Sequence, residues 1–262
     1  MHLHVDGREV YAYTGARAVL PSQRTIVFVH GAANDHSVWA LQSRYFAHHG
    51  FNVMALDLPG HGRSEGPALP SVETVAQWIL RTLDAAEIAK ATLVGHSLGA
   101  LASLAAAALA PARVDRLALV GPAVPMPVSE ALLDAAKAND HVAYELITGW
   151  SHSAARKLGG NRVPGMWMTG AALRLMERTP PGVLHTDLSA CNAYTGGLEA
   201  AAGVRCPALV VLGQRDLMAP AKNASAMCEA LVDCRLVTLA GAGHAMMAEQ
   251  PDAVLDALRA FV

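Results

Sequence analysis

The chain has 262 residues, of which 53% are hydrophobic, and its formal net charge is −2. This length and apolar fraction are enough for one catalytic domain with a modest insertion. Lysine and arginine are scattered and form no basic stripe, which argues against a nucleic-acid partner.

The predicted elements alternate between strand and helix for most of the chain. Two short strands, at residues 3–5 and 10–13, flank Asp6-Gly7 and should form an antiparallel hairpin at a sheet edge. Apolar runs bounded by glycine or proline then predict buried parallel strands at residues 25–29, 52–56, 91–94, 117–120, 208–212 and 236–239. Helical patterns occupy residues 38–49, 72–86, 98–110, 221–231 and 252–262. The expected fold is α/β, with a mostly parallel central sheet and helices on both faces.

The alternation stops once, between Val120 and Ala208. Helical patterns alone occur there, at residues 129–139, 142–148, 166–178 and 183–194. An insertion at this point would lie over the carboxyl ends of the strands, where open α/β sheets bind ligands. We expect residues 1–121 and 204–262 to form the core domain and residues 122–203 a helical cap.

The cap contains apolar side chains that suit an adaptable pocket. Trp150, Trp167 and Met168 are candidates for its wall, because tryptophan and methionine adapt to varied apolar ligands. At helical spacing, the same residues are more often part of a core, and that alternative stays open.

The strongest motif is Gly-His-Ser-Leu-Gly at residues 95–99, between a predicted strand and a predicted helix. In this context the serine sits on a sharp, strained turn that lifts its hydroxyl above the sheet. The helix N-terminus that follows points backbone N–H groups at a developing oxyanion. Ser97 is therefore the predicted nucleophile.

A serine nucleophile needs a base, and the base needs an acid that orients it. His244 follows the last predicted strand, and Asp216 follows the strand before it, so both lie at carboxyl strand ends with Ser97. Asp57 also follows a strand, but it precedes the serine, and we assign it a structural role in its loop. Residues 121–123 after another strand offer no carboxylate, which favours Asp216.

Two backbone N–H groups are candidates for an oxyanion hole. Leu98 N–H begins the helix after Ser97, and Ala32 N–H lies in the His-Gly-Ala-Ala loop after residues 25–29. Ala33 N–H is the alternative in the same loop.

These motifs, together with the Asp-Leu-Pro-Gly-His-Gly-Arg-Ser segment at residues 57–64, resemble in identity and order those of the α/β-hydrolase superfamily. The resemblance is to its capped serine esterase, haloperoxidase-like and C–C hydrolase branches, and it spans nearly all of the chain outside the cap. It implies the α/β-hydrolase fold and a Ser97, Asp216 and His244 triad. The resemblance does not extend to the branches that use an aspartate nucleophile. The cap resembles no known cap, so the resemblance implies no particular substrate.

The expected activity is hydrolysis of a carboxylic ester of an apolar or aromatic small molecule through an acyl-enzyme. Two alternatives stay open: cleavage of a C–C bond or lactone by the same triad, and a hydrolase-like receptor that binds its ligand with slow turnover. The expected partner is the small-molecule substrate, and a homodimer is left open.

The cysteines argue against metal chemistry. None of the four forms a C-x-x-C pair, and no histidines cluster beside them, so we expect no metal site and no cofactor. Reduced thiols and an N-terminus without a basic and apolar leader favour a cytoplasmic protein. The most apolar stretch, residues 98–110, is too short to span a bilayer.

Overall fold

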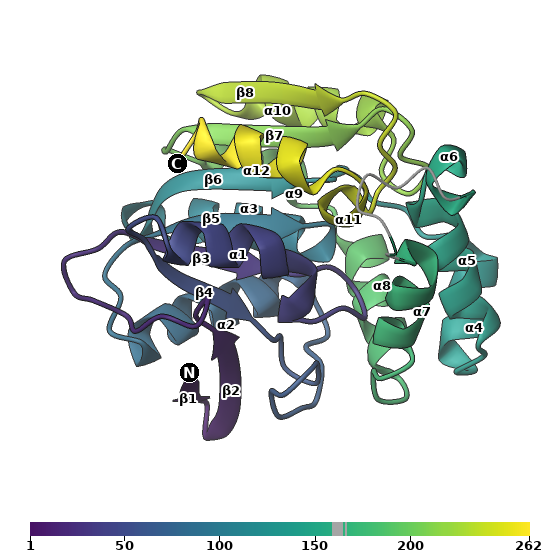
Figure 1. The fold of residues 1–262 in the computed structure, drawn as a ribbon, viewed down its shortest axis with the longest axis horizontal. Helices are drawn as coiled ribbons and strands as arrows, with labels where there is room; N and C mark the ends of the chain where they lie inside the picture. The colour runs from purple at the N-terminus through teal and green to yellow at the C-terminus, as the bar shows by residue number, and fades with distance from the viewer. Residues whose placement is uncertain (159–164, 166) are drawn as a thin grey trace.

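The computed structural model describes residues 1–158, 165 and 167–262. Its eight strands form one sheet in the order β1-β2-β4-β3-β5-β6-β7-β8, with helices on both faces (Figure 1). The strands are β1 His2–Val5, β2 Arg8–Tyr13, β3 Thr25–Val29, β4 Asn52–Leu56, β5 Ala91–His96, β6 Val114–Val120, β7 Ala208–Gly213 and β8 Cys234–Leu239. β1 with β2, and β2 with β4, pair antiparallel, and all other pairs are parallel. The predicted sheet and its edge hairpin are confirmed.

Each face of the sheet has its own layer of helices. The helices of the core are α1 Ala40–Ala47, α2 Val72–Ala85, α3 Leu98–Leu109, α9 Gly197–Gly203, α10 Ser225–Ala230, α11 Met246–Glu249 and α12 Pro251–Arg259. Short 3₁₀ turns precede α1, β6 and α10. α2, α3, α9 and α10 cover one face, while α1 and α12 cover the other.

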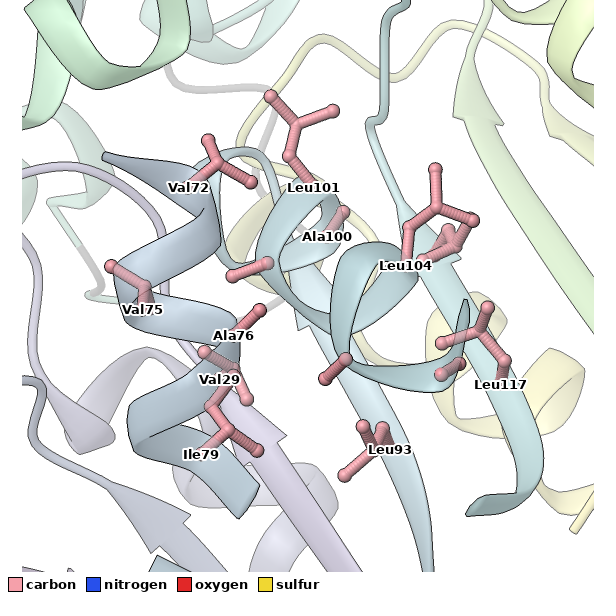
Figure 2. Close-up of a cluster of buried hydrophobic side chains, with 14 of the residues drawn as sticks. Val29, Val72, Val75, Ala76, Ile79, Leu93, Ala100, Leu101, Leu104 and Leu117 are labelled. Atoms are coloured by element: carbon pink, nitrogen blue, oxygen red, sulfur yellow. The ribbon is translucent and has the colours of Figure 1, made fainter. Parts of the chain in front are cut away.

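Alternate residues of each inner strand enter opposite layers. In β3, Val27 and Val29 pack with α2 and α3, whereas Ile26 and Phe28 pack with α1 and α12. Figure 2 shows the first of these layers, with Leu93 of β5 and Leu117 of β6 beneath α2 and α3. Burial on both faces explains why these strands read as continuous apolar runs.

The predicted strand at residues 117–120 begins three residues earlier than expected. Asp115 and Arg116 interrupt the apolar run, yet both continue the strand in β6. Asp115 accepts a hydrogen bond from Thr92 Oγ1 at 2.8 Å, and Arg116 Nε donates to the Phe261 carbonyl at 2.9 Å. These side-chain contacts satisfy the polar groups, which hydropathy alone does not reveal.

Among the described residues between β6 and α9, five helices form a separate group, here called the helical insertion. They are α4 Glu130–Lys137, α5 Val142–Ser151, α6 Ala154–Lys157, α7 Met168–Met176 and α8 Val183–Ala193. α4, α5, α7 and α8 share a small apolar cluster, α6 contacts α7, and the group lies beyond the carboxyl ends of the strands (Figure 1). Met166, the expected start of the helix at 166–178, lies outside the described residues.

The last helix before β7 differs from the insertion. α9, for which no helix was predicted, packs mainly on α3 and α10 of the core. Across the described part of the chain, no helix has the length and apolar character needed to cross a membrane.

Candidate active site

Ser97 lies on the tight turn between β5 and α3. Its φ of 54° and ψ of −118° are strained for a residue with a side chain. Two glycines make the turn sterically feasible: a Cβ on Gly95 would lie 2.2 Å from the Gly99 carbonyl oxygen, and one on Gly99 would lie 2.4 Å from the Val29 oxygen. Ser97 N–H donates to the Val120 carbonyl at 3.0 Å, which anchors the turn to β6. The strand–turn–helix geometry is that of a nucleophile elbow.

His244 and Asp216 are hydrogen-bonded and buried. His244 Nδ1 lies 2.7 Å from Asp216 Oδ2. Since a carboxylate only accepts, Nδ1 carries the proton and Nε2 is left for chemistry. Asp216 Oδ1 accepts from the N–H groups of Met218 and Ala219. Burial alone would raise the pKa of the Asp216 carboxyl, but the His244 charge and these hydrogen bonds outweigh it and leave that pKa below its usual value.

His96 lies beside His244 and fixes its backbone. Its Nε2–H donates to the His244 carbonyl at 3.0 Å, and the two rings lie 4.6 Å apart. Burial, and then the neighbouring His244 ring, lower the pKa of His96 to about 3. The neutral ring holds the His244 backbone without adding a charge beside the His244 ring.

The loop at residues 31–34 lies against Ser97. A Cβ on Gly31 would lie 3.0 Å from Ser97 Cβ. The Gly31 carbonyl accepts from His30 Nδ1 at 2.8 Å, while Leu58 N–H donates to His30 Nε2 at 3.0 Å. Ala33 N–H is engaged elsewhere, by Asp187 Oδ2 at 2.9 Å. Of the two candidates in this loop, Ala32 is therefore the better oxyanion donor.

A cavity of about 890 Å³ opens above Ser97, between the helical insertion and the strand ends. Ala32, Ser97 and His244 line it together, so the structure brings the predicted nucleophile, base and oxyanion loop to one site. Leu98, the other predicted oxyanion donor, is buried at the start of α3 directly after Ser97. Most of the lining side chains are apolar, and they include Met126, Leu132, Ile147, Leu175, Met218 and Met247.

Two of the three expected pocket residues line the cavity. Trp150 and Met168 are both part of the cavity wall. Trp167 is not among the described lining residues; it is 70% exposed and packs over Gly170 at the start of α7. The geometry gives no support to a pocket role for Trp167, and its exposure also rules out a core role.

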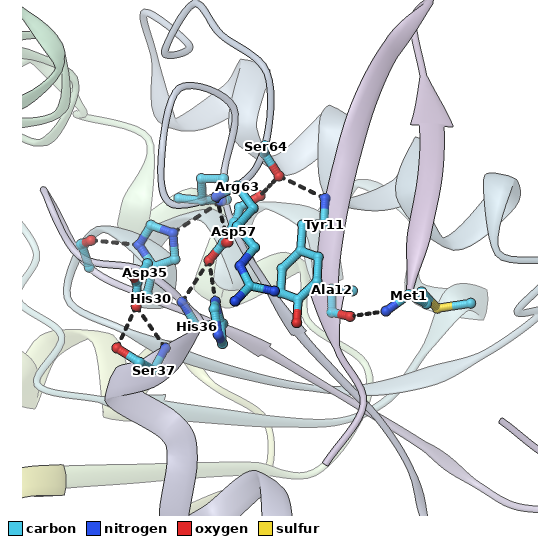
Figure 3. Close-up of polar contacts among 12 residues, drawn as sticks. Met1, Tyr11, Ala12, His30, Asp35, His36, Ser37, Asp57, Arg63 and Ser64 are labelled. Carbon is cyan, nitrogen blue, oxygen red and sulfur yellow. Dashed lines mark hydrogen bonds and ion pairs between the residues drawn. The ribbon is translucent and has the colours of Figure 1, made fainter. Parts of the chain in front are cut away.

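Asp57 belongs to a structural network, as the sequence suggested (Figure 3). Its Oδ1 accepts from His36 N–H and His36 Nδ1, both at 2.8 Å, and its Oδ2 from Arg63 N–H at 2.9 Å. Asp35, His36 and Asp57 place three potential metal ligands within 4.8 Å of one another. Protein donors already bind the Asp57 oxygens, so we assign this group no metal.

Two buried carboxylates that the sequence did not single out join the insertion to the site loops. Asp187 of α8 accepts from Ala33 N–H and lies 2.8 Å from His61 Nε2. Glu249 Oε1 accepts from Gly243 N–H at 3.0 Å and from Ser153 N–H at 3.2 Å. The only sequence signal was an acidic residue inside an apolar helix pattern, and that pattern does not specify a partner.

Comparisons with known proteins show the family of this chain. Residues 26–257 match the model of the Alpha/beta hydrolase family. Esterase YbfF of Escherichia coli is 27% identical over 252 residues, covering 90% of this chain and 92% of that protein. An (E)-2-((N-methylformamido)methylene)succinate hydrolase of Acinetobacter baylyi is 23% identical over 244 residues, covering 90% and 89%. The crystal structure of an enol-lactonase from Burkholderia xenovorans superimposes with a TM-score of 0.88 at 25% identity, covering 100% of this chain and 99% of that one. The chain belongs to the alpha/beta hydrolase family.

Proposed function

We propose that the protein is a serine hydrolase that cleaves a carboxylic ester of an apolar or aromatic small molecule. The observation that carries the proposal is the buried His244–Asp216 contact at the wall of the same apolar cavity that contains Ser97. A buried carboxylate bound to Nδ1 of a histidine, beside a serine that lines the same cavity, matches the requirements of acyl transfer.

The reaction would proceed in two halves. Ser97 Oγ attacks the ester carbon while its proton passes to His244 Nε2, and Ala32 N–H and Leu98 N–H stabilise the oxyanion. The intermediate collapses to an acyl-Ser97 ester, and the leaving alcohol takes the proton from His244. His244 then takes a proton from water as that water attacks the acyl carbon, and it gives the proton to Ser97 Oγ as the acid leaves.

The helical insertion would act as the cap that selects the substrate. Trp150 and Met168 contribute to the cavity wall from α5 and α7, and the catalytic side chains enter from the strand ends. Residues of the insertion thus contact the acyl or alcohol group away from the reacting carbonyl. We place residues 122–203 in this cap, apart from α9, which packs on the core.

A lactone is the second candidate substrate, favoured by the similarity to the enol-lactonase structure. The same residues can open a cyclic ester, since the chemistry at the carbonyl is unchanged and the alcohol stays tethered to the acyl group.

Labelling and a substrate panel test these proposals together. A fluorophosphonate should modify Ser97 alone, and peptide mapping would locate it. Aryl esters of increasing acyl length, lactones and C–C hydrolase substrates should then be compared, with Ser97→Ala as the control. Turnover of esters or lactones that vanishes in Ser97→Ala is expected. Labelling elsewhere, or ligand binding with no turnover of any member, would contradict a hydrolase.

A further inference from the structure

One carboxylate oxygen of the helical insertion contacts both the loop beside Ser97 and the 57–64 segment. Asp187 Oδ2 accepts from Ala33 N–H at 2.9 Å and from His61 Nε2 at 2.8 Å. Asp187 is only 3% exposed and His61 only 2% exposed. The three residues come from α8, from the 31–34 loop and from the 57–64 segment, so the contact fixes three separate parts of the chain together.

The His61 ring is held as a cation with no free nitrogen. Nε2 faces Asp187, and Nδ1 donates to the Pro59 carbonyl at 3.1 Å, so both nitrogens carry protons. Burial would lower the pKa of His61, but the charge and hydrogen bond of Asp187 outweigh it and raise that pKa. Its neighbour His30 remains neutral, because burial first and the His61 charge second lower its pKa to about 4.

Ala33 needs this support because its backbone is strained. Its φ of 52° lies in the left-handed region, which is unfavourable for a residue with a Cβ. The insertion binds both sides of Ala33, since Asp187 accepts from its N–H and Thr179 Oγ1 donates to its carbonyl at 3.2 Å. Upstream, the Gly31 carbonyl is fixed by His30. Ala32, between these two anchors, has its own N–H orientation determined by them.

We propose that Asp187, held by His61, is a positioning residue that orients Ala32 N–H for the oxyanion and makes the oxyanion hole depend on docking of α8. This inference rests on the proposed serine hydrolase function. α8 also contributes Leu188 and Cys191 to the cavity wall, one and four residues after Asp187. A substrate that displaces α8 therefore also disturbs the oxyanion donor, which links the fit of the substrate to the rate of the chemical step.

The test is the rate ratio between an aryl ester and its thionoester. An oxyanion hole stabilises an oxygen anion far better than the larger, more weakly accepting sulfur, so a displaced donor lowers this ratio. Asp187→Ala should lower kcat for the oxygen ester roughly 10- to 100-fold, with a smaller change in KM. The ester-to-thionoester ratio should fall by a similar factor.

A double variant covers the case in which Asp187→Ala does not fold. Replacing both partners of a buried ion pair by apolar residues often preserves stability. The His61→Leu, Asp187→Leu double variant should therefore keep a melting temperature near that of the wild type and still show the reduced ratio, because Ala33 N–H has lost its acceptor.

Two controls separate positioning from general damage. Leu83→Ala removes a buried apolar side chain from α2 of the core and should lower the melting temperature but leave the ratio unchanged. Asp134→Ala, exposed on α4, should change neither. A wild-type ratio in both Asp187 variants, with Ser97→Ala inactive, would overturn this inference alone. Full activity in Ser97→Ala would overturn it together with the proposed function.

Discussion

Two regions of the molecule each contain a buried histidine–aspartate pair, and the contact distance is nearly the same in both. His244 and Asp216 meet at 2.7 Å in the loops after β8 and β7, and His61 and Asp187 meet at 2.8 Å between the 57–64 segment and α8. The contact distance alone does not distinguish a catalytic pair from a structural one.

The difference lies in the second nitrogen of each ring. His61 Nδ1 donates to a backbone carbonyl, so the ring has no nitrogen left to exchange a proton with a ligand. His244 lines the cavity, and no hydrogen bond to its Nε2 occurs among the described residues. A histidine can serve as a base only where its free nitrogen opens onto the substrate, and this criterion is more selective than proximity to an aspartate.

The largest expected effect is at the histidine with the free nitrogen. His244→Ala should lower kcat for an aryl ester about 10⁴- to 10⁶-fold, because it removes the proposed base for the Ser97 hydroxyl. Steady-state kinetics, with the enzyme concentration taken from protein absorbance, would measure it. His61→Ala is the matched variant and should lose far less. Equal losses at the two positions would erase the distinction drawn between the two pairs.

A smaller but still large effect is expected at the acid of the first pair. Asp216→Asn should lower kcat about 10³- to 10⁴-fold, since an amide no longer selects the His244 tautomer with its proton on Nδ1. The fold should be retained, because Met218 and Ala219 N–H groups can still donate to the amide oxygen. Circular dichroism together with kcat would show both results. Activity within tenfold of the wild type would return Asp57 to consideration as the acid.

The smallest effect concerns the second pair and appears in stability. The pKa of His61 is raised in the folded protein. The pair with Asp187 therefore adds its full share to the free energy of unfolding below the unfolded pKa of about 6.5. This share is lost as pH rises through the folded pKa. As pH rises across this window, the wild type should therefore lose unfolding free energy relative to the His61→Leu, Asp187→Leu variant. Urea titrations from pH 5.5 to 9 would measure it.

Neighbouring groups should not obscure that trend. His30 has a pKa of about 4 and stays neutral across the window. Burial opposes ionisation of Asp57, but its hydrogen bonds from His36 and Arg63 prevail and hold its pKa below the usual value. A difference in unfolding free energy that does not change with pH would mean that His61 does not carry the charge assigned to it.

Most of the fold could be predicted from the sequence because its strands are buried on both faces. Ile26 and Phe28 face one layer while Val27 and Val29 face the other, so the strand is apolar throughout. Parallel strands also end at one edge, which is why residues far apart in the chain, such as Ser97 and His244, could be assigned to one site.

What escaped prediction depends on the packing of the insertion. Neither the Asp187 contact with His61 nor that of Glu249 with Ser153 has a sequence spacing that suggests it, because each crosses between the insertion and the core. Trp167 is apolar in a helical pattern, yet it lies at the exposed start of α7. Hydrophobic periodicity identifies a helix and its apolar face, but it does not specify which neighbouring element the helix meets.

The strained backbone at Ser97 lowers the stability of the fold at the same residue on which the proposed activity depends. Only glycine adopts φ of 54° and ψ of −118° without penalty, and strain of this kind costs about 1–3 kcal/mol. Ser97→Gly would consequently be a more thermostable protein and an inactive one. A laboratory selection for heat resistance alone would favour the loss of the nucleophile, so libraries built on this scaffold should hold Ser97 constant or select for turnover at the same time.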